Sequence, residues 1–249
     1  GTSSSAAWRW SLSRWIDRVL RRIGLARIPR GRQAAAYSGA VSNRLTADWI
    51  LTPFASADAE LRGDHRALVR RARELARNDG YAARFLGLLE ENVVGPHGIR
   101  LQAQVKRPNG DLDLGINARI EEAWAEWCEP ENASVDGRLS FRDIQALAIR
   151  CMARDGEALI REVIDPDRRF GYTLQVLDPD QLDLDYNVAP GQGQNEIRMG
   201  VEIDRFGRPV AYHLWDAHPY DYQGRRRERV RVPADEIYHL YLVERPGQT

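Results

Sequence analysis

The sequence lacks the cysteine patterns that stabilise secreted or zinc-binding domains. It has two cysteines, Cys128 and Cys151, which form no CxxC pair and have no histidine spaced to complete a zinc site. We therefore expect two reduced, buried thiols and a protein that folds in a cytoplasm. No apolar run approaches the roughly 20 residues of a spanning helix, and no signal-peptide core is evident, so we expect no membrane partner.

The chain also lacks net charge and is almost without lysine. Lys and Arg together number 36, as do Asp and Glu, so the whole chain exerts no electrostatic pull on nucleic acid and any polyanion contact must be local. Lys106 is the single lysine, which a GC-rich coding genome explains. Hydrophobic residues make up 43% of the chain, which excludes wholesale disorder.

The common signatures of nucleotide-binding, zinc-protease and esterase sites are absent as well. The sequence contains no GxxxxGK[ST] loop, no GxGxxG that opens a helix, no HExxH and no GxSxG. We therefore expect no catalytic residues, no cofactor and no metal, and the sequence does not indicate an enzyme.

One acidic run could still supply ligands for a divalent cation. It contains Asp178, Asp180, Asp183 and Asp185, but lacks the glycine and terminal glutamate of an EF-hand. Its proline and leucines suit a turn that passes into an exposed strand, so we predict that these carboxylates bind no catalytic metal. His213 and His218 have no carboxylate or cysteine at ligand spacing in the sequence and are interpreted as structural or surface residues.

Although the chain as a whole has no net charge, its N-terminal arm is basic. Residues 1–44 carry nine arginines against the single acid Asp17, and apolar residues recur within this segment at helical spacing. A basic amphipathic helix of this kind could lie on a membrane, touch DNA or dock on a neighbouring subunit. We predict docking through the stripe Trp8, Trp15, Ile16 and Val19. The arginines that would then face solvent or a polyanion are Arg14, Arg18, Arg21 and Arg22.

Hydrophobic spacing predicts a mainly helical region up to about residue 155. Helices are expected over 37–49, 58–78, 81–94 and about 116–127, and another begins at a cap at Ser140 with Cys151 facing inward. In the second of these, Leu61, Leu68 and Leu75 mark an apolar stripe, and the arginines are interpreted as a solvated face paired with acids of the same helix. A short strand is expected over 98–105, before the turn at 108–111.

After Asp155-Gly156 the pattern changes to short strands, expected over 158–164, 172–177, 197–204, 210–214 and 236–242. The fold class is therefore α+β, with a helical N-terminal half followed by a mainly antiparallel β region. The expected organisation is an arm over 1–36, a mainly helical part over 37–155 and a mainly β part over 156–249.

Collinear motifs from about residue 30 to the end resemble the lambda-type portal proteins of tailed phages. The first half contributes Tyr37-Ser-Gly-Ala40 with Arg44 and Trp49, the arginine-rich Leu68 to Asn78 segment, Asn92-Val-Val-Gly95 with Gly98-Ile99, Trp124 and Trp127, and Asp136-Gly137. The second half contributes Arg154-Asp-Gly-Glu157, Leu174 to Asp180, Gly200-Val-Glu202, Gly207 to His213, Val232 to His239 and Arg245-Pro-Gly-Gln248. Several of these are turn and strand-end positions, where backbone geometry demands glycine or proline.

The resemblance implies a portal wing-like fold and a structural subunit of a dodecameric ring at the capsid vertex of the virion, assembled in the host cytoplasm. Its implied partners are other copies of the chain, the terminase, the major capsid and head–tail joining proteins, and the double-stranded DNA that passes through the channel. Family members continue past the Arg-Pro-Gly-Gln motif into stem, clip and crown segments, which this sequence does not include.

Two other classes of function remain open from the sequence. One is a metal-dependent nucleic-acid-processing enzyme that uses the aspartates of residues 178–185. The other is a DNA-binding module that acts through the basic arm.

Overall fold

The computed structural model describes residue 44 and residues 55–191, 193–221 and 226–249. The chain divides after Phe54, and the fold below is that of residues 55–249. The predicted arm helix and the predicted helix over 37–49 lie outside the described residues. Among those that are described, no helix combines the length and the apolar character needed to cross a bilayer.

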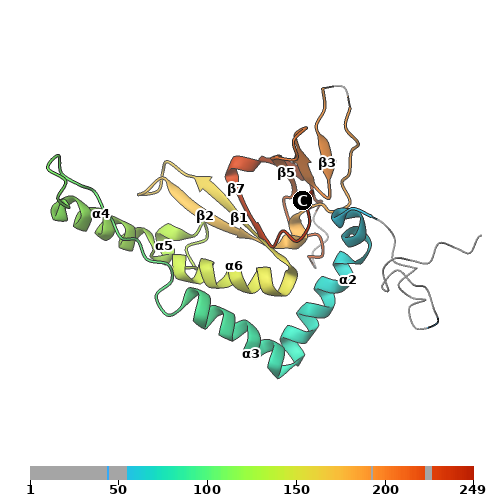
Figure 1. The fold of residues 1–249 in the computed structure, drawn as a ribbon, viewed down its shortest axis with the longest axis horizontal. Helices are drawn as coiled ribbons and strands as arrows, with labels where there is room; N and C mark the ends of the chain where they lie inside the picture. Colours follow the sequence, from blue (N-terminus) through green and yellow to red (C-terminus); the bar gives the residue numbers. More distant parts are fainter. Residues whose placement is uncertain (1–43, 45–54, 192, 222–225) are drawn as a thin grey trace, which may run out of the picture. The chain divides into compact units, whose positions relative to one another are not determined.

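The first half is helical, as the spacing predicts (Figure 1). Its elements are α2 (Ala57–Asn78), α3 (Gly80–Leu89), the π-helix η3 (Glu90–Val94), α4 (Leu114–Trp127), α5 (Pro130–Ala133) and α6 (Phe141–Asp155). Polar side chains cap the N-terminal ends of helices α2, α3, α4 and α6. The caps are Ser56, Asp79, Asp113 and Ser140, and each accepts a hydrogen bond from a backbone N–H of the first turn. At α6, Ser140 and Asp143 form a reciprocal capping box, which confirms the predicted start.

The predicted strand over 98–105 is wrong. This segment is extended, but it runs beside α4 and gives its backbone donors to helix side chains instead of to a strand. Ala103 N donates to Glu121 Oε1 (3.0 Å), and Val105 N donates to Asn117 Oδ1 (2.8 Å). The turn that follows is confirmed by an antiparallel bridge between Lys106 and Leu112.

The second half forms two antiparallel sheets, which confirms the α+β class. The first has the order β2-β1-β7, from β1 (Glu157–Ile164), β2 (Tyr172–Leu177) and β7 (Ile237–Tyr241). The second has the order β3-β4-β5-β6, from β3 (Glu196–Arg198), β4 (Val201–Ile203), β5 (Pro209–Trp215) and β6 (Arg229–Pro233). Two 3₁₀ turns, η4 (Pro179–Gln181) and η5 (Ala234–Glu236), connect strands of the two sheets.

The strand expected over 197–204 is in fact a hairpin of β3 and β4, turned by Met199 and Gly200, whose φ angles are 47° and 83°. A Cβ at Gly200 would lie 2.8 Å from the carbonyl oxygen of Asp183, so glycine is required there by both conformation and space. Strand β6 was not predicted, although its arginines alternate with valines in the period-two pattern of a strand.

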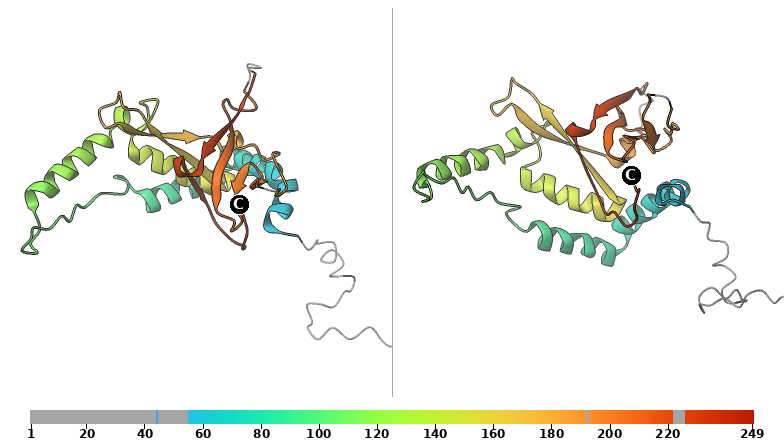
Figure 2. Two further views of the ribbon diagram at one scale, coloured as in Figure 1. Left: turned by 90° about the horizontal axis from the view of Figure 1, so that it is seen from above. Right: turned by 45° about the horizontal axis from the view of Figure 1, so that its top comes forward.

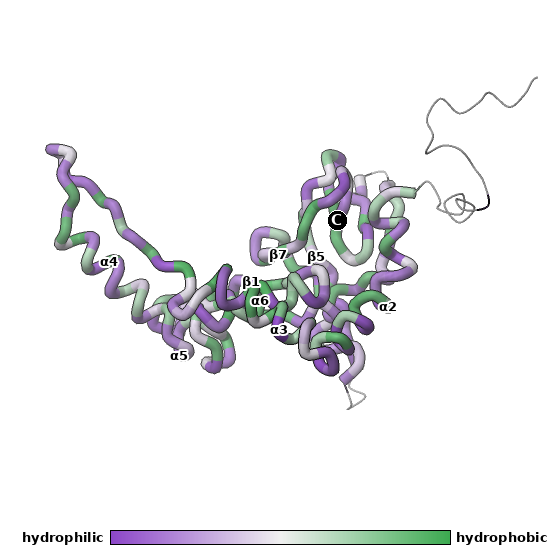
Figure 3. The backbone as a smooth tube through the Cα atoms, turned by 60° about the horizontal axis from the view of Figure 1, so that its bottom comes forward, coloured by the Kyte–Doolittle hydropathy of each residue, from purple (hydrophilic) through white to green (hydrophobic). Residues whose placement is uncertain are grey.

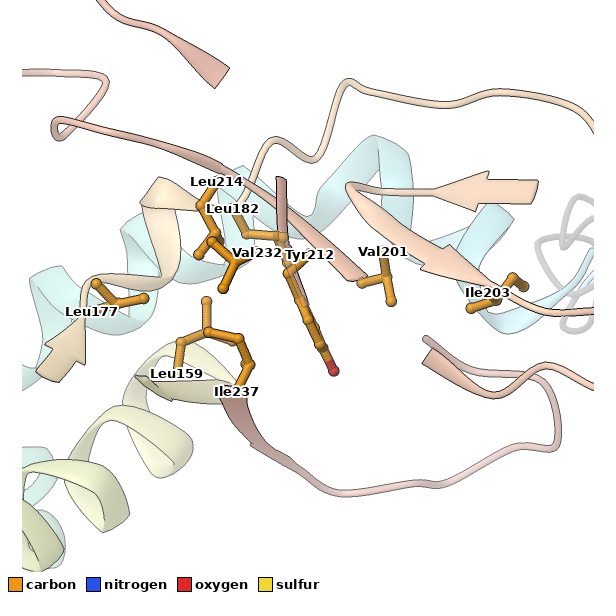
Figure 4. Close-up of a cluster of buried hydrophobic side chains, with 9 residues drawn as sticks. All are labelled: Leu159, Leu177, Leu182, Val201, Ile203, Tyr212, Leu214, Val232 and Ile237. Carbon is orange, nitrogen blue, oxygen red and sulfur yellow. The ribbon is translucent and has the colours of Figure 1, made fainter. Parts of the chain in front are cut away.

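The two sheets bury two apolar clusters. One joins them and includes Leu159, Leu177, Val201, Tyr212 and Ile237 (Figure 4). The other lies where α6 packs on β1 and β2, and contains Trp127, Ile144 and Cys151, so the predicted inward position of Cys151 is confirmed. Both cysteines are free.

Helix α6 packs on the first sheet with one side, and α2, α3 and η3 contact another side of it (Figure 2). The leucine stripe predicted on α2 is not buried in this arrangement. Leu68 and Leu75 are exposed, whereas Val69 is buried. The buried side of α2 instead combines Val69 with polar residues such as Asp58 and Arg73.

Candidate functional site

The aspartates of residues 178–185 are each paired with an arginine. Asp178 and Asp180 contact Arg73, Asp185 contacts Arg66, and Asp183 contacts Arg229. The segment forms the η4 turn and does not continue into an exposed strand, and Asp183 is buried. The predicted turn is therefore confirmed and the exposed strand is wrong.

Arg73 of α2 is the centre of this acidic cluster. Its guanidinium donates to Asp155 Oδ1 (2.9 Å) at the end of α6, to Asp180 Oδ2 (2.6 Å) and to Asp178 Oδ1 (3.2 Å). The planar fork of an arginine suits such a multiple contact, which a lysine ammonium could not reproduce. The prediction that the arginines of α2 pair with acids of their own helix is therefore wrong for Arg66 and Arg73.

Asp155 is the least accessible acid of the cluster, with a side chain that is 0% exposed. Burial by itself would raise its pKa, but the hydrogen bonds from Arg154 and Arg73 outweigh burial and hold the pKa below its ordinary value. Arg154 makes a two-bond contact with the same carboxylate, at 2.9 and 2.6 Å. The carboxylate is thus fixed in its ionised form between two cations.

His218 lies against the same carboxylates. Its Nε2 is 3.7 Å from Asp178 Oδ2 and 3.6 Å from Asp180 Oδ2, and the three residues are the one group of described side chains whose ligand atoms are close enough to share a metal ion. His218 has no carboxylate at ligand spacing in the sequence, because the fold brings Asp178 and Asp180 to it from about 40 residues away. His213 is buried and its Nε2 lies 3.4 Å from Glu202 Oε2; burial lowers its pKa.

The acidic cluster fits a structural role better than a metal centre. A cation bound by Asp178 and Asp180 would have to compete with the guanidinium of Arg73, which already contacts both carboxylates. The neighbouring Cys151 is contacted by Arg154, but burial raises the pKa of its thiol, which does not favour a nucleophile. The arrangement can therefore hold α2, α6 and η4 together by charge.

A second buried polar cluster joins α2 to the first sheet. Glu157 of β1 lies between His239 of β7, whose Nε2 is 2.7 Å from Oε2, and His65 of α2, whose Nε2 is 3.5 Å from Oε1. Burial would raise the pKa of Glu157, but the contacts with His239 and His65 outweigh it and lower the pKa to about 2. No local pattern could have indicated this cluster, because His239 is 82 positions from Glu157 and His65 lies still further away along the chain.

An apolar groove of about 790 Å³ opens beside α6. One side of α6 forms its floor, the first sheet and η3 form its walls, and Trp124, Trp127 and Phe141 close one end. These three rings contact one another with centroids 5.1 to 5.3 Å apart. Ile99 and Val93 on the rim are exposed, so the groove has the character of a protein contact surface.

The predicted interface and polyanion residues of the arm all lie outside the described residues. This applies to Trp8, Trp15, Ile16 and Val19 and to Arg14, Arg18, Arg21 and Arg22. Their roles therefore stay predictions.

Comparison with known proteins gives a consistent set of similarities. The profile of the family described as "Phage portal protein, lambda family" matches residues 42–249. The chain is 40% identical over 195 residues to the "Probable portal protein" of Halomonas phage phiHAP-1, covering 78% of this chain and 38% of that protein. It is 29% identical over 176 residues to the "Portal protein" of Escherichia phage N15, covering 66% of this chain and 32% of the relative. "Portal protein B" of Escherichia phage lambda is 27% identical over 174 residues, with 65% and 31% covered. The chain thus spans less than two fifths of the length of these relatives.

Proposed function

The chain belongs to the lambda family of phage portal proteins, and we propose that it is the N-terminal, wing-like part of a structural ring subunit at one vertex of the capsid. In this proposal, a dodecameric ring of the full-length protein is a conduit for double-stranded DNA during packaging and ejection. The ring contacts the terminase, the major capsid protein and the head–tail joining proteins, and it becomes part of the virion after assembly in the host cytoplasm.

The family match carries this proposal, because it extends over nearly all of the described fold. The acidic cluster agrees with it, since its carboxylates pair with arginines and connect α2 to α6 and η4. The deciding measurement is the mass of the native particle formed by the full-length protein. We expect a closed ring of many copies with a central channel, and a monomer or dimer at micromolar concentration would overturn the proposal.

A metal-dependent nuclease is the second candidate, favoured by the single observation that Asp178, Asp180 and His218 lie within reach of one ion. We expect the full-length protein to cleave neither DNA nor nucleotides with magnesium or manganese, because Arg73 occupies the carboxylates. Incubation with supercoiled and linear DNA over a range of metal concentrations measures this. Metal-dependent cleavage that is lost in Asp180→Ala and retained in Glu131→Ala would establish the enzyme instead.

The N-terminal arm is proposed to dock on an adjacent subunit or capsid partner through Trp8, Trp15, Ile16 and Val19. A helix this short is marginal alone in water, and tryptophans and arginines are the side chains that most often anchor interfaces. We expect a full-length variant without residues 1–28 to assemble less well while its unfolding transition is unchanged. Normal rings and capsids combined with a loss of salt-sensitive DNA binding would identify the arm as a nucleic-acid contact and contradict the docking proposal.

A further inference from the structure

The start of α2 is held to the segment 244–249 by polar contacts. Asp58 accepts hydrogen bonds from the backbone N (3.0 Å) and the hydroxyl Oγ1 (2.9 Å) of Thr249. Glu60 accepts a hydrogen bond from Arg245 Nη1 (2.6 Å), and both of these side chains are exposed. Figures 1 and 3 show the end of the chain beside the first turn of α2. Two segments that are distant in the sequence therefore meet here through hydrogen bonds and charge.

Packing is incomplete around the first two turns of α2, residues 57–63, where Asp58 is the one buried residue. A cavity of about 370 Å³ lies between α2 and the two sheets and is lined by Leu61 and Thr249 among other residues. A second cavity of about 260 Å³ adjoins the same turns on the side of Glu244. Side chains that border a void lose the contacts that a packed neighbour would give. The first turns of α2 therefore gain little stability from packing.

Gly63 weakens the helix at the end of these turns. Glycine in a helix interior is less favourable than alanine, because it loses more backbone freedom on folding. A Cβ added to Gly63 would have no atom of the described fold within 4 Å, and the residue is not in the left-handed conformation, so nothing in the fold requires glycine there. Gly63 is thus a weak point between the contacts of Asp58 and those made further along α2.

The remainder of α2 is held more firmly. Val69 is buried, and Arg73 donates hydrogen bonds to three carboxylates, of which that of Asp155 is fully buried. An ion pair between exposed side chains, such as that of Glu60 with Arg245, contributes less to stability than contacts to a buried carboxylate. The two parts of α2 therefore differ in the free energy that is needed to open them.

We propose that residues 57–63 and the segment 244–249 form a latch, which opens locally by a bend at Gly63 while the rest of α2 stays in place. Arg245 also donates a hydrogen bond to the carbonyl oxygen of Ala55 (2.8 Å), so the closed latch fixes the chain that enters α2 beside the segment 244–249. In the open latch these two parts of the chain separate. The latch is a property of this fold and does not depend on the proposed ring.

Hydrogen exchange of the full-length protein, followed by mass spectrometry of its peptides, measures this opening. Under native conditions at pH 7, we expect the amides of residues 60–67 to exchange at least about tenfold faster than those of residues 70–78 and of β1. The reason is that a local opening needs less free energy than unfolding of the whole domain.

Two substitutions test the two sides of the latch. Gly63→Ala should slow the exchange of residues 60–67 about fivefold, because alanine favours the helix. Thr249→Val removes the hydroxyl that binds Asp58 and should speed the exchange of the same amides about tenfold, as is typical when a hydrogen bond to a charged group is lost. Both variants should leave the exchange of residues 70–78 unchanged.

Gly87→Ala in α3 is the matched control, because a Cβ at Gly87 makes only an ordinary contact with a neighbouring arginine. It should leave the exchange of residues 60–67 unchanged, and a slowing as large as that of Gly63→Ala would contradict a bend at Gly63. Equal protection of residues 60–67 and 70–78 would overturn the latch, as would fast exchange that extends over the whole of α2. If Thr249→Val has no effect on residues 60–67, the start of α2 opens independently of the segment 244–249 and the proposal is wrong.

Discussion

Replacing Glu157 with glutamine is expected to lower the free energy of unfolding by about 3 kcal/mol at pH 7, as is typical when one partner of a buried charge cluster is removed. Glutamine keeps the shape of the side chain but leaves His239 and His65 without a carboxylate in a site from which water is excluded. Denaturant unfolding followed by circular dichroism measures the change. Glu162→Gln on the same strand is the control, because Glu162 accepts one exposed hydrogen bond from Tyr238.

The same carboxylate predicts a pH dependence. Its pKa in the folded protein is about 2, below the ordinary 4.5, so its contribution to stability is fully present above pH 4.5 and is lost as the pH falls from 4.5 towards 2. The contribution is on the order of 3 kcal/mol. Between pH 4.5 and 2, the free energy of unfolding should therefore decrease less steeply with falling pH in Glu157→Gln than in the unaltered protein. If the free energy of unfolding of the two proteins falls equally steeply with pH, the contacts with His239 and His65 do not lower the pKa of Glu157.

Replacing Arg73 with alanine is expected to cost a similar amount, about 3 kcal/mol, because it strips one cation from the buried carboxylate of Asp155. Arg154 remains on Asp155 and limits the loss. Asp178 and Asp180 would also be left as adjacent like charges beside His218. Arg70→Ala, an exposed change on the same helix, should alter the free energy of unfolding by no more than about 0.5 kcal/mol.

The stability of the Arg73→Ala variant should also fall less on acidification than that of the unaltered protein. The pKa of Asp155 is held below its ordinary value in part by Arg73, so the stabilisation it gives is present at neutral pH and lost as the pH falls through that lowered pKa. Without Arg73 the pKa of Asp155 should rise, and less stability is left to lose on acidification. If the forked geometry of the guanidinium matters, the stability of Arg73→Lys should be close to that of the alanine variant. If the positive charge alone matters, its stability should be close to that of the unaltered protein.

These two clusters explain how α2 stays in place although little of its apolar surface is buried. Polar contacts fix it along its length: Asp58 binds Thr249, Glu60 binds Arg245, His65 faces Glu157, Arg66 binds Asp185, and Arg73 binds Asp155. Leu68 and Leu75 remain exposed on this helix.

The sequence by itself determined the local structure and the family. The α+β order could be predicted because its signals lie in residues that are close in the sequence. These signals are the 3.6-residue spacing of the first half, the cap at Ser140 and the switch to short strands after Gly156. The turn and strand-end residues that support the portal resemblance also form short motifs of neighbouring residues. Where local signals were ambiguous, at residues 98–105 and 197–204, extended structure was predicted but its partners were not.

Only the tertiary structure decided which charges meet. Arg73 reaches Asp180 across 107 positions and Asp155 across 82, and His239 reaches Glu157 across another 82. No periodicity encodes such pairs, because an ion pair depends on where two elements cross and not on the pattern within either one. For the same reason the spacing of Leu68 and Leu75 did not reveal that they are exposed: a helix pattern shows which residues share a face, but packing determines whether the fold buries that face.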